Sequence, residues 1–275
     1  MSDFRGPIDL SKSCAQSFLR RIGYVKRKRT KAARKVPVYF EFIQMELLSE
    51  IQKLVKTYDI PDDLIINFDQ TIVMIVPVGH YTLDKVGSKQ VSILGLEDKR
   101  QVTMVLACTL SGNFLPPQII YQEKTDLCHP KYKFPEGWNV THSENHWSNE
   151  QTMQEYAENV LIPDVESVVD EYPLNHKDQK ALCFFDVFAA HRTDSFKDRL
   201  DDNDIKIGFV PASCTGEMQP LDVAGNDEFK RKIKNSFINW YSDELSKGMK
   251  LGKAASDVKI YIKLLISNPF MHLGS

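Results

Sequence analysis

The chain has 275 residues, of which 42% are hydrophobic and 26% charged, a composition typical of a globular protein with one large domain or one domain and a smaller unit. No apolar run reaches about 18 residues, so we expect no membrane-spanning helix and no membrane partner. The five cysteines are scattered, odd in number and without a Cys-x-x-Cys motif, which favours free thiols in a reducing compartment.

The net charge of −2 conceals a strongly basic N-terminal segment. Residues 1–36 contain eleven Lys or Arg against two Asp, and the rest of the chain is acidic. Such a segment suits contacts to nucleic-acid phosphates or a nuclear-import signal, with a flexible solvated arm as the alternative. We therefore expect a nuclear location and DNA contacts from the basic side chains Arg20, Arg21, Lys26, Arg27, Lys28, Arg29, Lys31, Arg34 and Lys35.

The N-terminal part contains two predicted helices joined by a linker. Apolar residues recur at three- and four-residue spacing over 9–22, which predicts a short amphipathic helix that ends at Gly23. Residues 24–36 are predicted to be a basic linker. A second helix is predicted over 39–57, with Pro61 beyond its end.

From residue 61 onward, apolar runs of strand length alternate with helical patterns. Strands are predicted at 64–68, 91–94, 101–110, 114–121, 181–185 and 205–210. Helices are predicted at 148–172, 195–200, 221–246 and 254–267. The segment 125–147 is predicted to be an ordered loop. Antiparallel strands come first and strand-helix-strand units follow, which predicts an α/β domain with a mixed sheet.

Local residues refine two of these elements. Strands 101–110 and 114–121 flank a Gly-containing turn, so we expect a hairpin whose second strand is weakened by its prolines. In the helix over 148–172, Ser148 is the expected N-cap, and Pro163 is expected to kink or split the helix.

Three aspartates lie at the ends of predicted elements. Asp69 follows the first buried strand, Asp186 follows strand 181–185, and Asp222 begins the helix from residue 221. Each has an ordinary explanation, as a strand end, a paired carboxylate or a helix N-cap. Together, if they converge, they would form the smallest plausible carboxylate cage for two hard divalent cations such as Mg²⁺.

Six short segments occur in a fixed order over about residues 9–245. They are 66–71, 98–103, 112–121, 145–148, 185–188, and 219–222 together with 229–230. In this order they resemble the DDE-superfamily endonuclease domain of pogo-type transposases, the group that includes the Tigger, jerky and centromere protein B relatives. The thirty-five residues between Asp186 and Asp222 also fit this family, which ends its triad in Asp.

The resemblance implies an RNase H-like α/β fold, with a central mixed sheet flanked by helices. It implies that Asp69, Asp186 and Asp222 are both the catalytic residues and the ligands of Mg²⁺ or Mn²⁺, with Asp69 contacting both ions. The implied reaction is phosphoryl transfer on DNA, in which water cleaves a strand and the freed 3′-hydroxyl then attacks target DNA. DNA is the implied partner, and a homodimer is compatible with the resemblance.

Two features depart from the family pattern. Val187 stands where many relatives have Asn, although it lies outside the triad. Only residues 9–23 resemble part of the tandem helix-turn-helix units that precede such endonuclease domains, so we expect an N-terminally truncated chain. The expected domains are a helix-turn-helix remnant with basic linker (1–36), a connecting helix (37–60), the endonuclease domain (61–250) and a C-terminal tail (251–275).

Three functions remain open from the sequence. The first is the metal-dependent DNA endonuclease, in a copy that could be inactive. The second is a domesticated or degenerate, non-catalytic nuclear DNA-binding protein, suggested by the basic N-terminal segment. The third is a protein-interaction fragment, suggested by an amphipathic helix at 9–22 without an evident packing partner.

Two further groups of residues have ordinary explanations. Cys128, His129, His142 and His146 suggest zinc, but loop packing is favoured because a second well-placed cysteine is missing. His191 lies five residues after Asp186, and local hydrogen bonding is favoured over a role in tuning protonation at the site.

Overall fold

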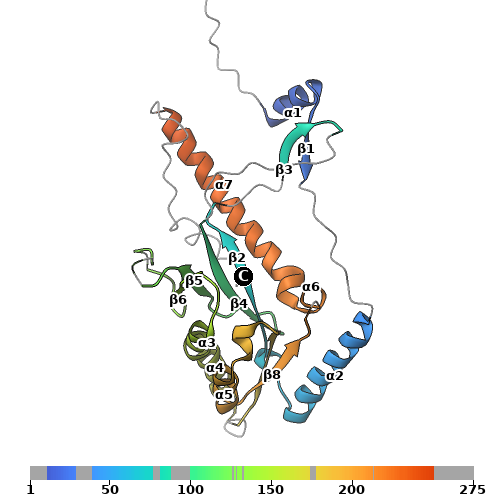
Figure 1. Ribbon diagram of the computed structural model, residues 1–275, viewed down its shortest axis with the longest axis vertical. Coiled ribbons are helices and arrows are strands. Elements are labelled where there is room, and N and C mark those ends of the chain that lie inside the picture. Colours follow the sequence, from blue (N-terminus) through green and yellow to red (C-terminus); the bar gives the residue numbers. More distant parts are fainter. Residues whose placement is uncertain are drawn as a thin grey trace, which may run out of the picture. The chain divides into compact units, whose positions relative to one another are not determined.

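The structure is a computed structural model of the chain. It describes residues 11–28, 39–76, 81–87, 100–125, 127, 129–131, 133–173, 178–212 and 214–250. The chain divides into two compact units, one of residues 1–34 with 78–98 and the other of residues 35–77 with 99–275 (Figure 1). Each unit is described by itself. The predicted domain boundaries at residues 36, 60 and 250 stay predictions.

The smaller unit consists of one helix and a two-stranded ribbon. Helix α1 spans Lys12–Arg21, and the Ser11 hydroxyl caps it by accepting a hydrogen bond from the Cys14 amide at 3.2 Å. Strand β1 (Tyr24–Lys28) follows at once and pairs antiparallel with β3 (Tyr81–Lys85). The helix predicted over 9–22 is thereby confirmed over its described part.

The predicted basic linker at 24–36 is wrong for its first five residues, which form β1. Their partner strand lies more than fifty residues further along the chain, so no local sequence pattern predicts the pairing. The remainder of the predicted linker and the predicted strand at 91–94 lie outside the described residues.

The larger unit is built on one six-stranded mixed sheet. Its strands are β2 (Ile65–Met74), β4 (Gln101–Thr109), β5 (Gln118–Gln122), β6 (Asn139–Ser143), β7 (Ala181–Asp186) and β8 (Ile205–Val210). The spatial order is β6-β5-β4-β2-β7-β8. Strand β4 runs antiparallel to β2 and β5, and the other pairs are parallel. The core order β5-β4-β2-β7-β8, with β4 alone reversed, is that of an RNase H-like fold and confirms the expected fold class.

Helices flank this sheet. They are α2 (Phe40–Tyr58), α3 (Glu150–Tyr156), α4 (Ile162–Asp170), α5 (Asp194–Asp202), α6 (Thr215–Met218) and α7 (Asn226–Lys250). Single 3₁₀ turns occur at Asp62–Leu64 and Ala189–Arg192, and π-helical turns occur at Ala157–Leu161 and Leu221–Gly225. In the part of the chain that the structure describes, no helix is long and apolar enough to cross a membrane.

The two faces of the sheet bury separate apolar clusters, as the alternation along β4 shows. Val105 and Ala107 belong to the cluster that also contains residues of α3, α4 and α5, whereas Met104 and Leu106 belong to the cluster closed by α7. Because strand side chains alternate between faces, one strand supplies both cores. Figure 1 shows α7 running along the sheet beside β2 and β4.

Several predicted boundaries need correction. Asp69 lies in the middle of β2 and not at its end, because β2 continues to Met74 along the long strand β4. Strand β5 begins at Gln118 and not at residue 114, since Pro116 and Pro117 have no amide hydrogen to give to a ladder. The loop predicted over 125–147 contains a strand, β6.

The segment predicted as one helix over 148–172 is divided, as expected, just before Pro163. A π-helical turn at Ala157–Leu161 separates α3 from α4. The N-cap is Asn149 and not Ser148: its side chain accepts from the Thr152 amide at 2.9 Å, and the Thr152 hydroxyl accepts from the Asn149 amide at 3.0 Å. The helix predicted over 254–267 lies outside the described residues.

Candidate active site

Two of the predicted site residues lie on neighbouring strands. Strands β2 and β7 pair in parallel from Ile65↔Leu182 to Asn67↔Phe184. Continuing this register by two residues sets Asp69 beside Asp186, and both side chains then project to the same face of the sheet. This is the face that α7 covers, since Phe68 and Phe185, the preceding residues on each strand, belong to the opposite cluster.

The third aspartate arrives from the chain that leads into α7. Asp222 lies on the π-helical turn Leu221–Gly225, and Asn226 begins α7 four residues later. The Asn226 amide group donates to Asp69 Oδ2 at 2.5 Å and to Asp222 Oδ1 at 3.4 Å. One neutral side chain therefore joins the carboxylates of Asp69 and Asp222.

Burial and neighbouring negative charges raise the pKa of the Asp69 carboxyl. Only 7% of this residue is exposed, and burial raises the pKa of its carboxyl to about 7. The negative charge of Asp222, and to a smaller extent that of Asp186, acts in the same direction. Hydrogen bonds from the Asn226 amide and the Gln70 backbone oppose the rise. Asp222 and Asp186 thus lie close enough to Asp69 to raise the pKa of its carboxyl.

Asp186 has a different environment, because a histidine side chain contacts its carboxylate. His191 Nδ1 lies 2.7 Å from Asp186 Oδ1, and the Phe188 amide donates to the same oxygen at 3.2 Å. Although burial raises the pKa of Asp186, the hydrogen bond and charge of His191 outweigh it and hold the pKa below its usual value. Asp186 is therefore ionised at neutral pH, whereas Asp69 titrates there.

His191 is fixed in place by aromatic packing. It is 1% exposed, and its ring lies edge-on to Phe68 and Phe185 with centroids 5.0 Å and 5.3 Å away. Its Nε2 contacts the Gln70 side-chain nitrogen at 2.5 Å. The local hydrogen-bonding interpretation of His191 is confirmed, and its partner is the predicted site residue Asp186.

Two buried amide side chains tie the segments that carry the aspartates together, although no role was predicted for either. Asn67 donates to the Phe184 carbonyl at 2.9 Å and accepts from the Leu221 amide at 3.3 Å. Gln219 donates to the Phe68 carbonyl at 2.8 Å. Both lie in segments that carry the family resemblance, 66–71 and 219–222, and Asn67 lies two residues before Asp69, on the same face of the strand.

The donor atoms at this site fit a hard divalent cation. Mg²⁺ and Mn²⁺ favour oxygen ligands, and the site offers the carboxylates of Asp69 and Asp222 together with Asn226 Oδ1, a buried acceptor without a hydrogen-bond partner. Within the described ranges, no group of three or more His, Cys, Asp or Glu side chains is arranged to hold a metal ion. The fit of a divalent cation to this site therefore depends on the amide oxygen of Asn226 in addition to the carboxylates of Asp69 and Asp222. The carboxylate of Asp186 contacts His191 instead.

The basic residues predicted to contact DNA belong to the smaller unit. Arg20 and Arg21 lie exposed in the last turn of α1, and Lys26 lies exposed on β1. Arg20 and Lys26 line a hollow of about 250 Å³ between the helix and the strand. The backbones of Arg27 and Lys28 continue β1, and the remaining predicted contacts, Arg29, Lys31, Arg34 and Lys35, lie outside the described residues.

The suggested zinc ligands are engaged elsewhere or not described. His146 Nε2 contacts the Gln101 side chain at 2.7 Å, and its Nδ1 lies 3.2 Å from the Thr103 hydroxyl. The rings of His129 and His142 are tilted against each other with centroids 5.3 Å apart, and Cys128 lies outside the described residues. His129 and His146 lie in loops as expected, whereas His142 lies on β6.

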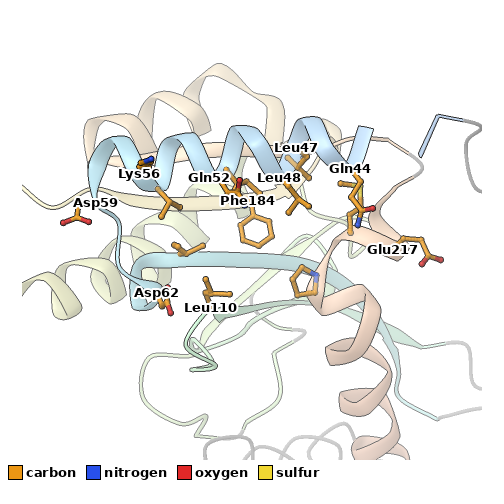
Figure 2. Close-up of a pocket in the computed structure, with 15 residues that line it drawn as sticks. Gln44, Leu47, Leu48, Gln52, Lys56, Asp59, Asp62, Leu110, Phe184 and Glu217 are labelled. Atoms are coloured by element: carbon orange, nitrogen blue, oxygen red, sulfur yellow. The ribbon is translucent and has the colours of Figure 1, made fainter. Parts of the chain in front are cut away.

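A separate apolar groove lies beside α2, and Asp69, Asp186 and Asp222 do not line it (Figure 2). Its volume is about 790 Å³, and Figure 2 shows Leu47 and Leu48 of α2 and Phe184 of β7 directed into it. Acidic side chains stand at its ends, with Asp59 at one and Glu217 at the other. The groove and the carboxylate cluster are distinct features of the larger unit.

Comparisons with known proteins agree on one family. The DDE superfamily endonuclease family matches residues 99–264. The proteins named "Pogo transposable element with KRAB domain" from Homo sapiens and Mus musculus are each 25% identical over 175 residues, which is 63% of this chain and 27% of the relative. The chain thus spans about a quarter of the length of these curated relatives.

Solved structures of Mos1 transposase show a weaker likeness. The paired-end complex with the left transposon end has a TM-score of 0.47 at 11% identity, covering 96% of this chain and 68% of that chain. The mariner paired-end complex with Mn has a TM-score of 0.46 at 11% identity, covering 93% and 65%. Because these scores are below 0.5, assignment rests on the family match, which covers more than half of the chain. The chain belongs to the DDE superfamily of endonucleases.

Proposed function

We propose that this chain is a metal-dependent DNA endonuclease domain of the transposase type, which cleaves and joins DNA strands by phosphoryl transfer. One observation carries the proposal: a buried carboxylate, Asp69, is joined to Asp222 through Asn226 and lies beside Asp186. A polar cluster of this kind is costly inside a protein unless it binds a cation or substrate.

The proposed roles follow from the surroundings of each carboxylate. Asp69 and Asp222 hold one divalent cation, and Asp186, kept ionised by His191, completes the site on the neighbouring strand. Mg²⁺ or Mn²⁺, when bound, supplies Lewis-acid stabilisation to the scissile phosphate and lowers the pKa of an attacking water. The chain itself contributes rigid positioning, because the ligands stand on paired strands and on a helix start tied to them.

DNA is the proposed partner, and the nucleus is the proposed location. Exposed Arg20, Arg21 and Lys26 give the smaller unit a basic surface that suits phosphate contacts. The two curated relatives are described as pogo transposable elements, which supports DNA as the substrate. A homodimer is compatible with this proposed function.

A plasmid-nicking assay tests the proposal. We expect the purified chain to convert supercoiled plasmid to the open-circular form with Mn²⁺ or Mg²⁺ and not with EDTA. Asp69→Asn, Asp186→Asn and Asp222→Asn should each lower the rate by at least about a hundredfold. Asp198→Asn, an exposed position on α5, is the matched control and should retain the wild-type rate. Equal nicking by the wild type and Asp186→Asn contradicts the proposal.

The alternative is a non-catalytic nuclear DNA-binding protein. It is favoured by one observation, that no three carboxylate or imidazole side chains in the described part of the chain are grouped as a metal site. A gel-shift titration at increasing salt separates the two functions. Salt-sensitive binding that survives replacement of all three aspartates, in a wild type that does not nick DNA, supports the alternative.

A further inference from the structure

We infer that Asn226 is a fourth residue of the metal site, which aligns the Asp69 and Asp222 carboxylates through its amide N–H groups and offers its side-chain oxygen to the cation. This inference rests on the proposed function. It adds a neutral ligand and positioning residue to the three aspartates.

The first support is an unused acceptor inside the protein. Asn226 is 5% exposed, and its Nδ2 donates to Asp69 and Asp222. Its Oδ1 is buried without a hydrogen-bond partner. A buried acceptor left unsatisfied is unfavourable, and a cation bound at this oxygen would offset that cost. The unused oxygen belongs to the same amide group whose nitrogen contacts both carboxylates.

The second support is the local geometry of the chain. The π-helical turn Leu221–Gly225 ends where α7 begins at Asn226. Phe229, Ile233 and Phe237 follow at helical spacing and are buried against the sheet, so the first residue of α7 is fixed on the same side. Single π-helical turns inside helices are frequent at functional sites. Here the turn sets Asp222 and Asn226 to contact each other and Asp69.

The third support is the charge balance of the site. Two carboxylates in contact with one donor repel each other, and the amide N–H groups offset part of that repulsion without adding a positive charge. A lysine in this position would compete with a divalent cation, whereas an asparagine leaves the site negative. An amide oxygen is also an ordinary ligand of hard cations.

The experiment measures cation binding directly. Free Mn²⁺ is titrated against the purified full chain and followed by electron paramagnetic resonance, and urea unfolding is measured with and without Mn²⁺. The variants are Asn226→Leu, which removes both donor and acceptor, and Asn226→Asp, which keeps the acceptor oxygen. Asn159→Leu is the control, because Asn159 is exposed and its amide contacts only a backbone carbonyl, that of Glu155.

We expect Asn226→Leu to weaken Mn²⁺ binding by about tenfold or more and Asn159→Leu to leave it unchanged. Asn226→Asp should bind Mn²⁺ at least as tightly as the wild type and gain more stability from Mn²⁺, because it adds a carboxylate to the three aspartates. A role confined to folding would make Asp as damaging as Leu, since Asp also lacks the amide donors.

The outcomes separate this inference from the proposed function. Wild-type Mn²⁺ binding that Asn226→Leu leaves unchanged, or that Asn226→Asp loses to the same extent as Asn226→Leu, overturns the role of Asn226 and leaves the aspartate site standing. Failure of the wild type to bind Mn²⁺ overturns the proposed metal-dependent function, and the role of Asn226 with it.

Discussion

Asn67 and Phe184 are joined by a hydrogen bond of 2.9 Å from the Asn67 side-chain amide to the Phe184 carbonyl, and each lies two residues before an aspartate of the candidate site. The oxygen of the same Asn67 side chain accepts from the Leu221 amide, one residue before the third aspartate. One buried amide therefore sets the spacing of the three segments that carry Asp69, Asp186 and Asp222.

Replacement of Asn67 by leucine should damage both stability and the site. It leaves the Phe184 carbonyl and the Leu221 amide without their side-chain partner, which costs roughly 1–3 kcal/mol for each buried group that stays unpaired. We expect a lower urea midpoint and weaker Mn²⁺ binding in Asn67→Leu. Asn203→Leu, whose amide contacts only the exposed Arg199 carbonyl, is the control. An unchanged midpoint would show that Asn67 does not join these segments.

The hydrogen bond between His191 and Asp186 gives a pH-dependent prediction. His191 lowers the pKa of Asp186, so the stability it contributes is present above the usual carboxyl pKa and is lost as the pH falls through the depressed value. A double-mutant cycle of Asp186→Asn and His191→Phe should therefore show a coupling of about 1 kcal/mol at pH 7 that shrinks below pH 4. Coupling that is constant with pH, or zero at pH 7, contradicts this pairing.

The elements of the fold that produce a local hydrophobic pattern were predicted correctly from the sequence. Strands β4, β7 and β8 and the helices α2 and α7 lie close to their predicted ranges, because continuous apolar runs and helical spacing are local signals. Strand β6 was missed because 139–143 contains a single aliphatic residue, Val140, and becomes a strand only through pairing with β5. The β1–β3 ribbon was missed because its two strands also form only through pairing with each other.

Only the charged residues of the candidate site were predicted from the sequence. Each aspartate alone has an ordinary explanation, and Asp69, Asp186 and Asp222 were singled out together through the family resemblance; the structure brings the segments that carry them together. Asn67 lies in segment 66–71 and Asn226 lies outside the six segments, and no role was predicted for either from the sequence. Their contacts with the segments that carry the aspartates become visible only when the strands are paired and α7 is in place.

The aromatic core beside the site gives a stability prediction. Phe68 is fully buried and stacks on Phe185 with a centroid distance of 4.5 Å, with Tyr156 edge-on at 5.6 Å. Phe68→Ala should lower the free energy of unfolding by about 3–5 kcal/mol, and Phe68→Leu by clearly less. Phe42→Ala, at an exposed position on α2, should change it by less than about 0.5 kcal/mol. Urea unfolding measures all three, and equal losses at Phe68 and Phe42 would contradict the burial of Phe68.

The raised pKa of Asp69 makes the stability of the metal-free protein fall with pH. With a pKa of about 7 in the folded state and an ordinary value in the unfolded chain, the folded state binds the extra proton between about pH 4 and pH 7. The free energy of unfolding should therefore decrease with a slope approaching about 1.4 kcal/mol per pH unit in that window, before other groups are counted. Asp69→Asn keeps the shape of the side chain and removes the titration, so it should flatten this slope and stabilise the metal-free protein at pH 8.

Urea unfolding at pH 5, 6, 7 and 8 in EDTA measures this difference between wild type and Asp69→Asn, and the exposed Asp198→Asn serves as the control. Mn²⁺ should reverse the order at pH 8, because the cation binds the ionised carboxylate and stabilises only the wild type. A parallel pH dependence for wild type and Asp69→Asn would show that Asp69 ionises normally. In that case the burial of Asp69 beside Asp222 would not destabilise the ionised carboxylate, and a bound cation would have no such destabilisation to offset.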